Sequence, residues 1–227
     1  MKDLYIIVEG QTELEFMNRL MIPYWRTQLG YQNNIQPIIV QMSGGGHGFN
    51  NIEHFKNTIE PIMNYQNAPF ITSFIDYYGI NSEKKMPGYK DCQKKANAQE
   101  RITCLEAKLQ EAVQQINEYR FFIPYIQLHE FEALLFSDSE GFAYEAEGIK
   151  QVVATVASDF KTPEDINDSY ETAPSKRLEE IYRSHKEKFS KVADGNDIAE
   201  EIGIGKMMEQ CPRFRMWAES IISRLGS

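Results

Sequence analysis

Three apolar, strand-like segments of this sequence are each followed at once by acidic side chains. The pairs are residues 4–8 followed by Glu9, residues 68–75 followed by Asp76, and residues 121–128 followed by Glu130 and Glu132. Runs of this kind predict buried strands. Because open α/β sheets bind ligands at the carboxyl ends of their strands, we expect these carboxylates to converge if the strands are neighbours in one parallel sheet.

Carboxylates gathered at one edge of a sheet would favour a hard divalent cation. Their oxygen atoms suit Mg²⁺ or Mn²⁺ better than zinc when no matching cysteines accompany them. Such cations favour phosphate chemistry. The alternative is that each acid only caps the helix that follows it. A single acid fits both interpretations equally, and three strand ends together favour a site.

The elements that must position these acids alternate between strand and helix. Helices are predicted over residues 12–28, 50–65 and 99–119, and a further strand over residues 35–40. This order implies a mostly parallel sheet. Beyond residue 138 the pattern is helical, with helices expected over residues 140–160, 175–189 and 207–225. We therefore predict an α/β domain over residues 1–138 and a helical appendage packed on it over residues 139–227.

The charge of the chain limits how it could bind nucleic acid. A net charge of −9 disfavours non-specific binding through the whole surface, but it permits a local basic groove. Lys176 and Arg177 fall in a predicted first helical turn, where the helix dipole disfavours cations. A bound phosphate would offset that cost, whereas a solvated helix face is the ordinary alternative.

Cysteine usage and the start of the chain indicate a compartment. Cys92, Cys104 and Cys211 are widely separated and lack metal-type spacing, so free thiols in a reducing compartment are expected. The sequence has neither a signal-peptide pattern nor an apolar stretch long enough to cross a bilayer. These features predict a cytoplasmic protein without membrane attachment.

The glycine-rich segment 43–48 lacks the lysine and hydroxyl of a P-loop, and we expect a loop with a solvated His47.

Two motifs resemble the TOPRIM fold of topoisomerases, primases and OLD-type nucleases. They are the segment Ile7-Val8-Glu9-Gly10-Gln11-Thr12-Glu13 and the segment Phe74-Ile75-Asp76-Tyr77-Tyr78-Gly79. The stretches 129–136, 172–178 and 211–214 are similar to an uncharacterised bacterial family of TOPRIM-like proteins, a domain of unknown function. The resemblance spans nearly the whole chain. It implies a TOPRIM-like three-layer α/β sandwich with a mostly parallel central sheet, followed by a C-terminal helical region.

The resemblance also implies roles for individual residues. Glu9 matches a glutamate that acts in acid/base or metal chemistry, Glu13 matches a second acid of OLD-type nucleases, and Asp76 matches the first acid of an Asp-x-Asp metal motif. Tyr78 stands where the second aspartate of that motif belongs, and a tyrosine hydroxyl is a poor Mg²⁺ ligand. Glu130 or Glu132 could supply the missing charge, and because two acids at spacing i, i+2 do not share one side of a helix, we expect only one of them, Glu130, to face the site. Beside it, His129 could orient an acid or relay a proton, or lie buried on a backbone carbonyl.

Two functions from different classes follow. The first is a Mg²⁺- or Mn²⁺-dependent phosphodiesterase acting on DNA or RNA, in phage or plasmid defence as the OLD-type resemblance implies, and it could form a homodimer. In it Glu9, Asp76 and His129 are catalytic, Glu9, Glu13, Asp76 and Glu130 bind the metal, and Lys176 and Arg177 bind phosphate. The second is a non-catalytic or conditionally active partner subunit of an ATPase encoded nearby.

Overall fold

The computed structural model describes residues 2–41, 48–166 and 170–226. The expectation about His47 therefore lies outside the described residues. In chain order the elements are β1 (Leu4–Val8), α1 (Gln11–Phe16), the π-helical turn η1 (Met17–Met21), α2 (Ile22–Leu29), β2 (Ile35–Ile39), α3 (Ile52–Met63), β3 (Phe70–Asp76), η2 (Tyr77–Gly79), α4 (Tyr89–Cys92), α5 (Ala98–Asn117), β4 (Phe122–Ile123), β5 (Ile126–Gln127), η3 (Phe131–Ser137), η4 (Ser139–Phe142), α6 (Ile149–Ser158), η5 (Pro163–Asp165), η6 (Tyr170–Thr172), α7 (Pro174–Ser184), α8 (Ala193–Gln210) and α9 (Pro212–Leu225).

The described strands form one parallel sheet in the order β2-β1-β3-β4, and β5 also pairs with β3. Val8 lies opposite Ile39 on one side and Phe74 on the other, and Asp76 lies opposite Gln127. The α/β class and the parallel sheet predicted from the sequence are confirmed. The carboxyl ends of β1, β3 and β5 share one edge of this sheet, where the predicted site residues follow.

The predicted strand over residues 121–128 is divided into β4 and β5 by Pro124. Proline has no backbone N–H to donate to the ladder. The hydroxyl of Ser73 replaces the missing contacts: it accepts from the Tyr125 N–H at 2.9 Å and donates to the Tyr125 carbonyl at 2.8 Å. The interruption therefore leaves no unpaired backbone group at Tyr125, and β5 continues toward the site.

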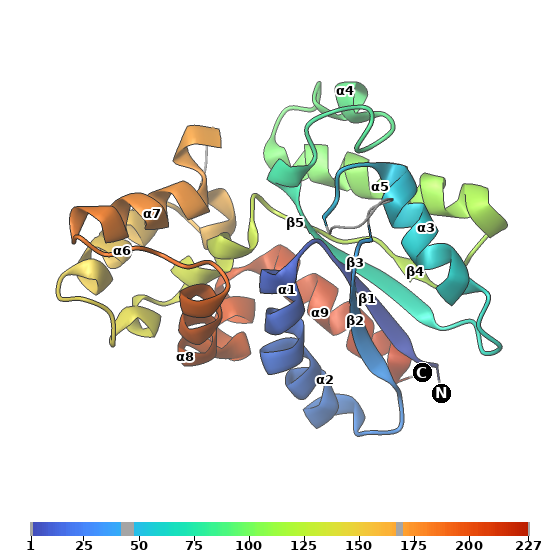
Figure 1. The fold of residues 1–227 in the computed structure, drawn as a ribbon, viewed down its shortest axis with the longest axis horizontal. Coiled ribbons are helices and arrows are strands. Elements are labelled where there is room, and N and C mark those ends of the chain that lie inside the picture. The colour runs from blue at the N-terminus through green and yellow to red at the C-terminus, as the bar shows by residue number, and fades with distance from the viewer. Residues whose placement is uncertain (1, 42–47, 167–169, 227) are drawn as a thin grey trace.

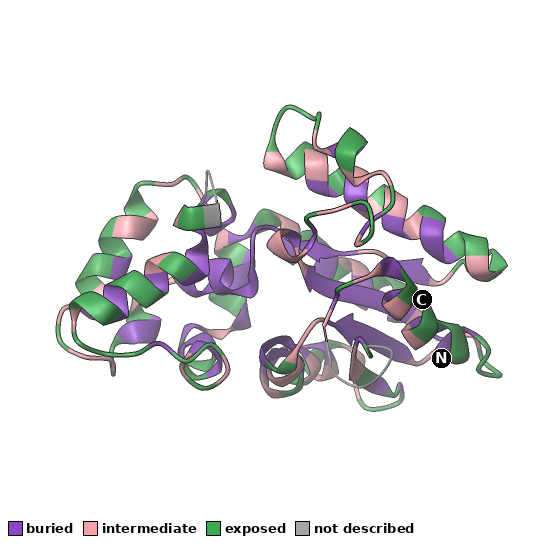
Figure 2. Cartoon of the chain, turned by 45° about the horizontal axis from the view of Figure 1, so that its top comes forward, coloured by how far each residue is buried: buried purple, intermediate pink, exposed green. Residues whose placement is uncertain are grey.

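Alternation along β1 assigns its side chains to two hydrophobic layers. Leu4, Ile6 and Val8 belong to one buried cluster, whereas Tyr5 and Ile7 belong to the other. Helices α3 and α5 cover one face, and α1, α2 and α9 lie on the other (Figure 1). Strands β1, β3, β4 and β5 are almost wholly buried, the edge strand β2 is mostly partly exposed, and the outer helices keep exposed faces (Figure 2). The sheet is thus the middle of three layers.

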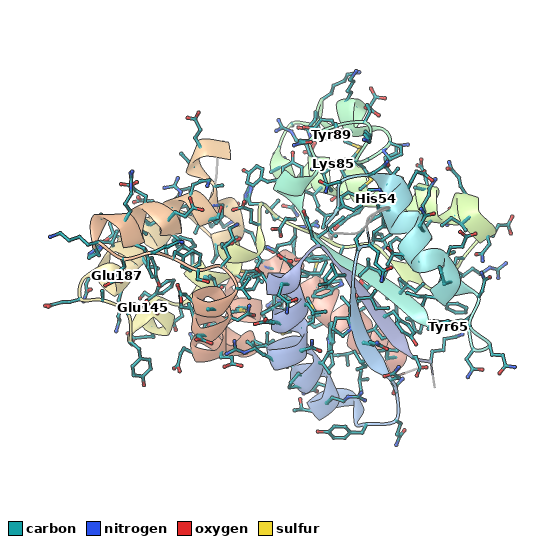
Figure 3. The ribbon with its side chains drawn as sticks, viewed as in Figure 1. His54, Tyr65, Lys85, Tyr89, Glu145 and Glu187 are labelled. Carbon is teal, nitrogen blue, oxygen red and sulfur yellow. A yellow bond between two sulfur atoms is a disulfide. The ribbon has the colours of Figure 1, made fainter. Side chains whose placement is uncertain are left out.

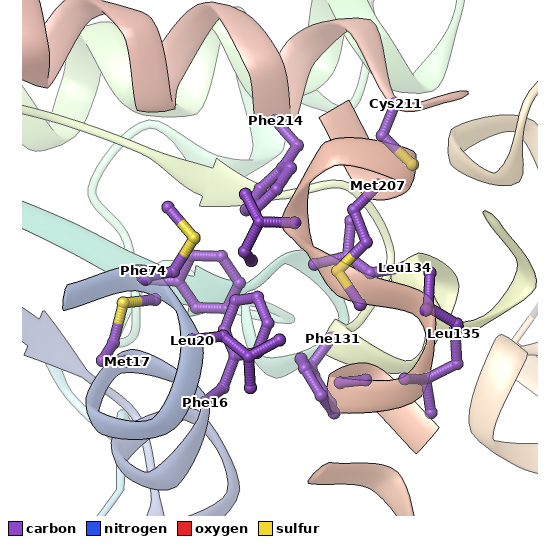
Figure 4. Close-up of a cluster of buried hydrophobic side chains, with 14 of the residues drawn as sticks. Phe16, Met17, Leu20, Phe74, Phe131, Leu134, Leu135, Met207, Cys211 and Phe214 are labelled. Carbon is purple, nitrogen blue, oxygen red and sulfur yellow. The ribbon is translucent and has the colours of Figure 1, made fainter. Parts of the chain in front are cut away.

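The helix α9 closes the layer on the α2 side of the sheet. The indole of Trp217 donates to the hydroxyl of Thr72 in β3 at 2.9 Å, and the indole of Trp25 donates to the Ala218 carbonyl at 3.2 Å. Phe16, Phe74 and Phe214 meet in the same core (Figure 4). The predicted boundary at residue 138 stays a prediction, but the last helix lies against the sheet itself.

The helices α6, α7 and α8 form a lobe beside the sheet (Figure 1). The sequence patterns did not predict α8, because glycines and charged residues interrupt the spacing of its apolar residues. Gly203 adopts a positive φ of 75° and bends this helix, which turns the apolar face as the chain proceeds. Ile198 and Met207, on either side of the bend, are both buried.

Cys92 of α4 and Cys104 of α5 form a disulfide, and Cys211 is a buried free thiol. The prediction of free thiols is therefore wrong for Cys92 and Cys104. The polar segment after β3 folds back on α5, which brings two cysteines that are 12 residues apart into contact. The inference of a reducing compartment loses its basis. In the part of the chain that is described, no helix is long and apolar enough to span a bilayer.

Candidate functional site

Five carboxylates gather where β1, β3 and β5 end, and we call Glu9, Glu13, Asp76, Glu130 and Glu132 the acidic cluster. Glu13, Glu130 and Glu132 are buried, whereas Glu9 and Asp76 keep partial access to solvent. Burial raises the pKa of Asp76 well above its usual range, and the charges of the other four carboxylates raise it further. The predicted acids therefore lie within electrostatic reach of one another.

Backbone N–H groups orient three of these carboxylates. Gly10 donates to Glu13 Oε2 at 2.8 Å, Phe131 donates to Asp76 Oδ1 at 3.0 Å, and Ser175 donates to Glu130 Oε2 at 3.0 Å. These N–H groups begin α1, η3 and α7, so only Glu13 accepts at the start of its own helix, whereas Asp76 and Glu130 accept from helix starts far along the chain and do not cap the helices that follow them. Each cap uses one oxygen of the carboxylate, which fixes the direction of the other. Capping and cation binding are therefore compatible.

Glu9 differs from its neighbours, because its Oε2 atom is buried and has no hydrogen-bond partner. Burial raises the pKa of Glu9, while the backbone N–H of Asp76 and the charge of Lys85 oppose the shift. Lys85 lies on the segment between η2 and α4 (Figure 3), where it donates to the Gly79 carbonyl at 2.7 Å. A Cβ atom on Gly79 would stand 2.8 Å from Glu9 Oε2, so only glycine leaves room for this carboxylate.

Lys191 is a member of the site that sequence reasoning missed. Its ammonium group lies 2.8 Å from Glu132 Oε1, and the Glu132 side chain is only 2% exposed. Burial opposes the charge of Lys191, but attraction to Glu132, Glu130 and Asp76 raises its pKa above the usual range. Lys191 comes from the segment between α7 and α8, and no motif distinguishes it from the other lysines there. Only the tertiary fold places it in the cluster.

Both Glu130 and Glu132 enter the cluster, although only one was expected to. Glu130 has an extended backbone with φ −151° and ψ 164°, and the 3-10 helix begins after it at Phe131. The helical spacing argument does not apply across that boundary. Burial raises the pKa of Glu132 to about 7, with Glu130 adding to the shift and Lys191 opposing it.

His129 fits the interpretation of a buried histidine held by a backbone carbonyl. Its Nε2 lies 3.0 Å from the Glu164 carbonyl and its Nδ1 lies 3.2 Å from the Tyr78 hydroxyl. Because a carbonyl can only accept, Nε2 carries a proton. His129 also has a positive φ of 65°, which is uncommon outside glycine. Its side chain therefore joins the loop after β3 to the turn that carries Glu130.

Lys176 and Arg177 lie in the first turn of α7, as expected. Lys176 forms an ion pair with Glu179 at 2.7 Å, and Arg177 donates to the Thr172 carbonyl at 2.9 Å. The anionic group that accepts an N–H at this helix start is the carboxylate of Glu130. An internal carboxylate thus occupies the role that was expected of a phosphate, and phosphate binding by Lys176 and Arg177 stays a prediction.

The donor set of the cluster suits a hard cation, since it consists of carboxylate oxygens and includes the unpartnered Oε2 of Glu9. Within residues 2–41, 48–166 and 170–226, no three His, Cys, Asp or Glu side chains converge closely enough to form a ready-made metal site. The side chains would have to move closer together to share one ion. Burial raises the pKa values of Glu9, Glu13, Asp76 and Glu132, and the charge of at least one neighbouring carboxylate adds to each shift, so a cation would relieve this repulsion.

Comparisons with known proteins place the chain in a family. A family model described as a domain of unknown function (DUF4276) matches residues 8–222. No curated protein and no solved structure matches the chain. The matched span begins at the end of β1 and ends within α9, so it covers the sheet, the acidic cluster and the helical lobe. The chain therefore belongs to the DUF4276 family.

Proposed function

We propose that this protein is a Mg²⁺- or Mn²⁺-dependent phosphodiesterase that cleaves DNA or RNA. We also propose that its three-layer sandwich is of the TOPRIM type and that the protein serves in phage or plasmid defence. The acidic cluster is its active site. The observation that supports this most directly is the Glu9 carboxylate, which has a buried oxygen without a partner at the edge of a parallel sheet. An acceptor in that state lacks a cation or a proton.

In this proposal the residues of the acidic cluster have different roles. Glu9 and Asp76, which keep access to solvent, hold the cation, and Glu13 and Glu130 complete its surroundings. A bound divalent cation supplies charge stabilisation to the phosphate oxygens and lowers the pKa of a bound water molecule. Because burial raises its pKa, Glu9 is a stronger proton acceptor than an ordinary glutamate. The raised pKa of Asp76 favours its protonated form, so cation binding there competes with protons and affinity rises with pH.

The first experiment compares Glu9→Gln with Glu60→Gln, a matched change at an exposed position of α3. Labelled single-stranded DNA, duplex DNA and RNA are incubated with each protein in Mn²⁺ and in EDTA. We expect the wild type and Glu60→Gln to cleave at least one substrate, and Glu9→Gln to lose about 100-fold or more, as removal of a general base does. Unchanged circular dichroism would show that the fold is retained. Full activity of Glu9→Gln would refute the assignment.

The second experiment measures Mn²⁺ binding by titration calorimetry. Asp76→Asn keeps the Oδ1 acceptor for the Phe131 N–H, so the fold survives while the cation loses a charged ligand. A wild-type isotherm that weakens in Asp76→Asn supports the proposal. If the wild type neither binds Mn²⁺ nor cleaves nucleic acid, the alternative function is favoured, namely a partner subunit that works with an ATPase. An ATPase gene beside this one would then identify the partner.

A further inference from the structure

A pocket of about 570 Å³ has His129 in its wall. Leu128 lies beside it, and the remaining lining comes from the start of α5, the turn around η5 and the first turns of α9. No carboxylate of the acidic cluster lines this pocket, but His129 directly precedes Glu130 in the chain. The pocket and the cluster are therefore neighbours. Its volume lies within the range of about 300–1,000 Å³ that is common for small-molecule sites.

The charges around this pocket compensate one another. Lys161 and Arg213 line it, and so do Glu164 and Asp165, which gives no formal net charge. Both acids are already engaged, because Glu164 accepts two backbone N–H groups at the start of α9, each at 3.0 Å, and Asp165 accepts from the Thr162 hydroxyl at 2.8 Å. A free multiply charged anion would gain little here. A neutral ligand with hydrogen-bonding edges fits better.

Donor capacity remains on Arg213, although its side chain is only 10% exposed. Its Nη2 donates to Glu106 at 2.6 Å and to the Ile126 carbonyl at 3.5 Å, whereas its Nε is buried without a partner. A buried guanidinium with an unused N–H favours an added acceptor, which could reach this Nε after a small shift of the Arg213 side chain. The side-chain amide of Gln99 supplies a further donor and acceptor at the mouth.

The apolar part of the lining comes from Leu128, Pro212 and Met216. Met216 is 56% exposed, which is unusual for a large apolar side chain in this protein. An exposed thioether beside polar groups provides a contact surface for a flat ring. The pocket thus combines an apolar surface with hydrogen-bonding groups, and the ligand should have the same combination.

We infer that this pocket is a nucleoside subsite, which takes the base and sugar next to the phosphodiester bond held at the acidic cluster. The inference rests on the proposed function for its setting. A nucleobase is neutral, has apolar faces and carries donors and acceptors on its edges, which matches the lining. His129 forms the wall between the base in the pocket and the cluster that begins at Glu130.

The test uses the full chain in EDTA, so that binding is measured without cleavage. Adenosine, cytidine and uridine are titrated by ligand-observed NMR, with ribose and inorganic phosphate as comparison ligands. We expect at least one nucleoside to bind saturably and ribose not to bind. Gln99→Ala and Met216→Ser should weaken binding about tenfold, as the loss of one hydrogen bond or apolar contact does. Gln115→Ala, at an exposed position of the same helix α5, should have no effect.

The outcomes separate this inference from the proposed function. Saturable nucleoside binding that survives Glu9→Gln supports the subsite whether or not the chain cleaves nucleic acid. Binding of phosphate without any nucleoside would overturn it in favour of an anion site. Absence of nucleoside binding, or equal binding by Gln99→Ala and Gln115→Ala, would overturn it even if the acidic cluster proves catalytic.

Discussion

Replacement of Glu132 by glutamine should make the protein more stable at alkaline pH than the wild type. Burial raises the pKa of Glu132 from 4.5 to about 7 even though Lys191 pairs with it. A shift of about 2.5 units corresponds to about 3 kcal/mol, since each unit is about 1.4 kcal/mol. The side chain is 2% exposed, so solvent screening reduces this figure little.

The sign follows from proton linkage. A raised pKa means that the folded state holds a proton which the unfolded state releases, so this contribution to stability is full below pH 4.5 and is lost as the pH rises through about 7. Glutamine resembles the protonated acid and does not titrate. Between pH 5 and pH 8 the wild type should therefore lose about 2 to 3 kcal/mol of unfolding free energy that Glu132→Gln does not lose.

Urea unfolding at pH 5, 6, 7 and 8 in EDTA measures this difference. Glu60→Gln, at an exposed site, should follow the wild-type curve at every pH. If Glu132→Gln has the same pH slope as the wild type, Glu132 does not carry the proton that its burial implies. If the variant is instead less stable at pH 8, the ion pair with Lys191 outweighs burial and the reasoning fails.

Three further predictions concern the structure around the site. Gly79→Ala should push the Glu9 carboxylate aside and abolish the Mn²⁺ isotherm in calorimetry. The loss of stability should be only about 1–2 kcal/mol, because the added methyl group meets the movable end of a side chain. An unchanged isotherm would contradict this prediction. Ser73→Ala should lower the free energy of unfolding by about 2–4 kcal/mol in urea titration, because two buried backbone groups of Tyr125 lose their partner; a loss below about 1 kcal/mol would show that the strand closes the gap itself. Cys104→Ser should lower stability by about 3 kcal/mol through loss of the disulfide loop; the same deficit measured in reductant, where the wild type also lacks the bond, would disprove that cause.

Local sequence patterns were enough to predict the sheet and the acids at its edge. The apolar runs before Glu9 and Asp76 correspond to β1 and β3, and the parallel order follows from their alternation with helices. Strands leave a local pattern in the sequence, because successive side chains point to opposite faces of the sheet. The end of a strand, and the acid that follows it, can therefore be predicted from the sequence alone. The helix α8 could not be predicted in this way. Gly203 rotates the apolar face of the helix partway along, so its apolar residues do not repeat with one helical period.

What surrounds those acids was decided by tertiary structure. Lys191 reaches Glu132 from more than 50 residues away, and the backbone of Ser175 reaches Glu130 across 45 residues. The pairing of Cys92 with Cys104 likewise depends on the fold of the segment after β3. Contacts of this kind leave no periodic trace in a sequence, because they are fixed by how separate layers pack rather than by local backbone geometry. The chain thus specifies which edge of its sheet carries the charge, and packing specifies which groups neutralise and orient it.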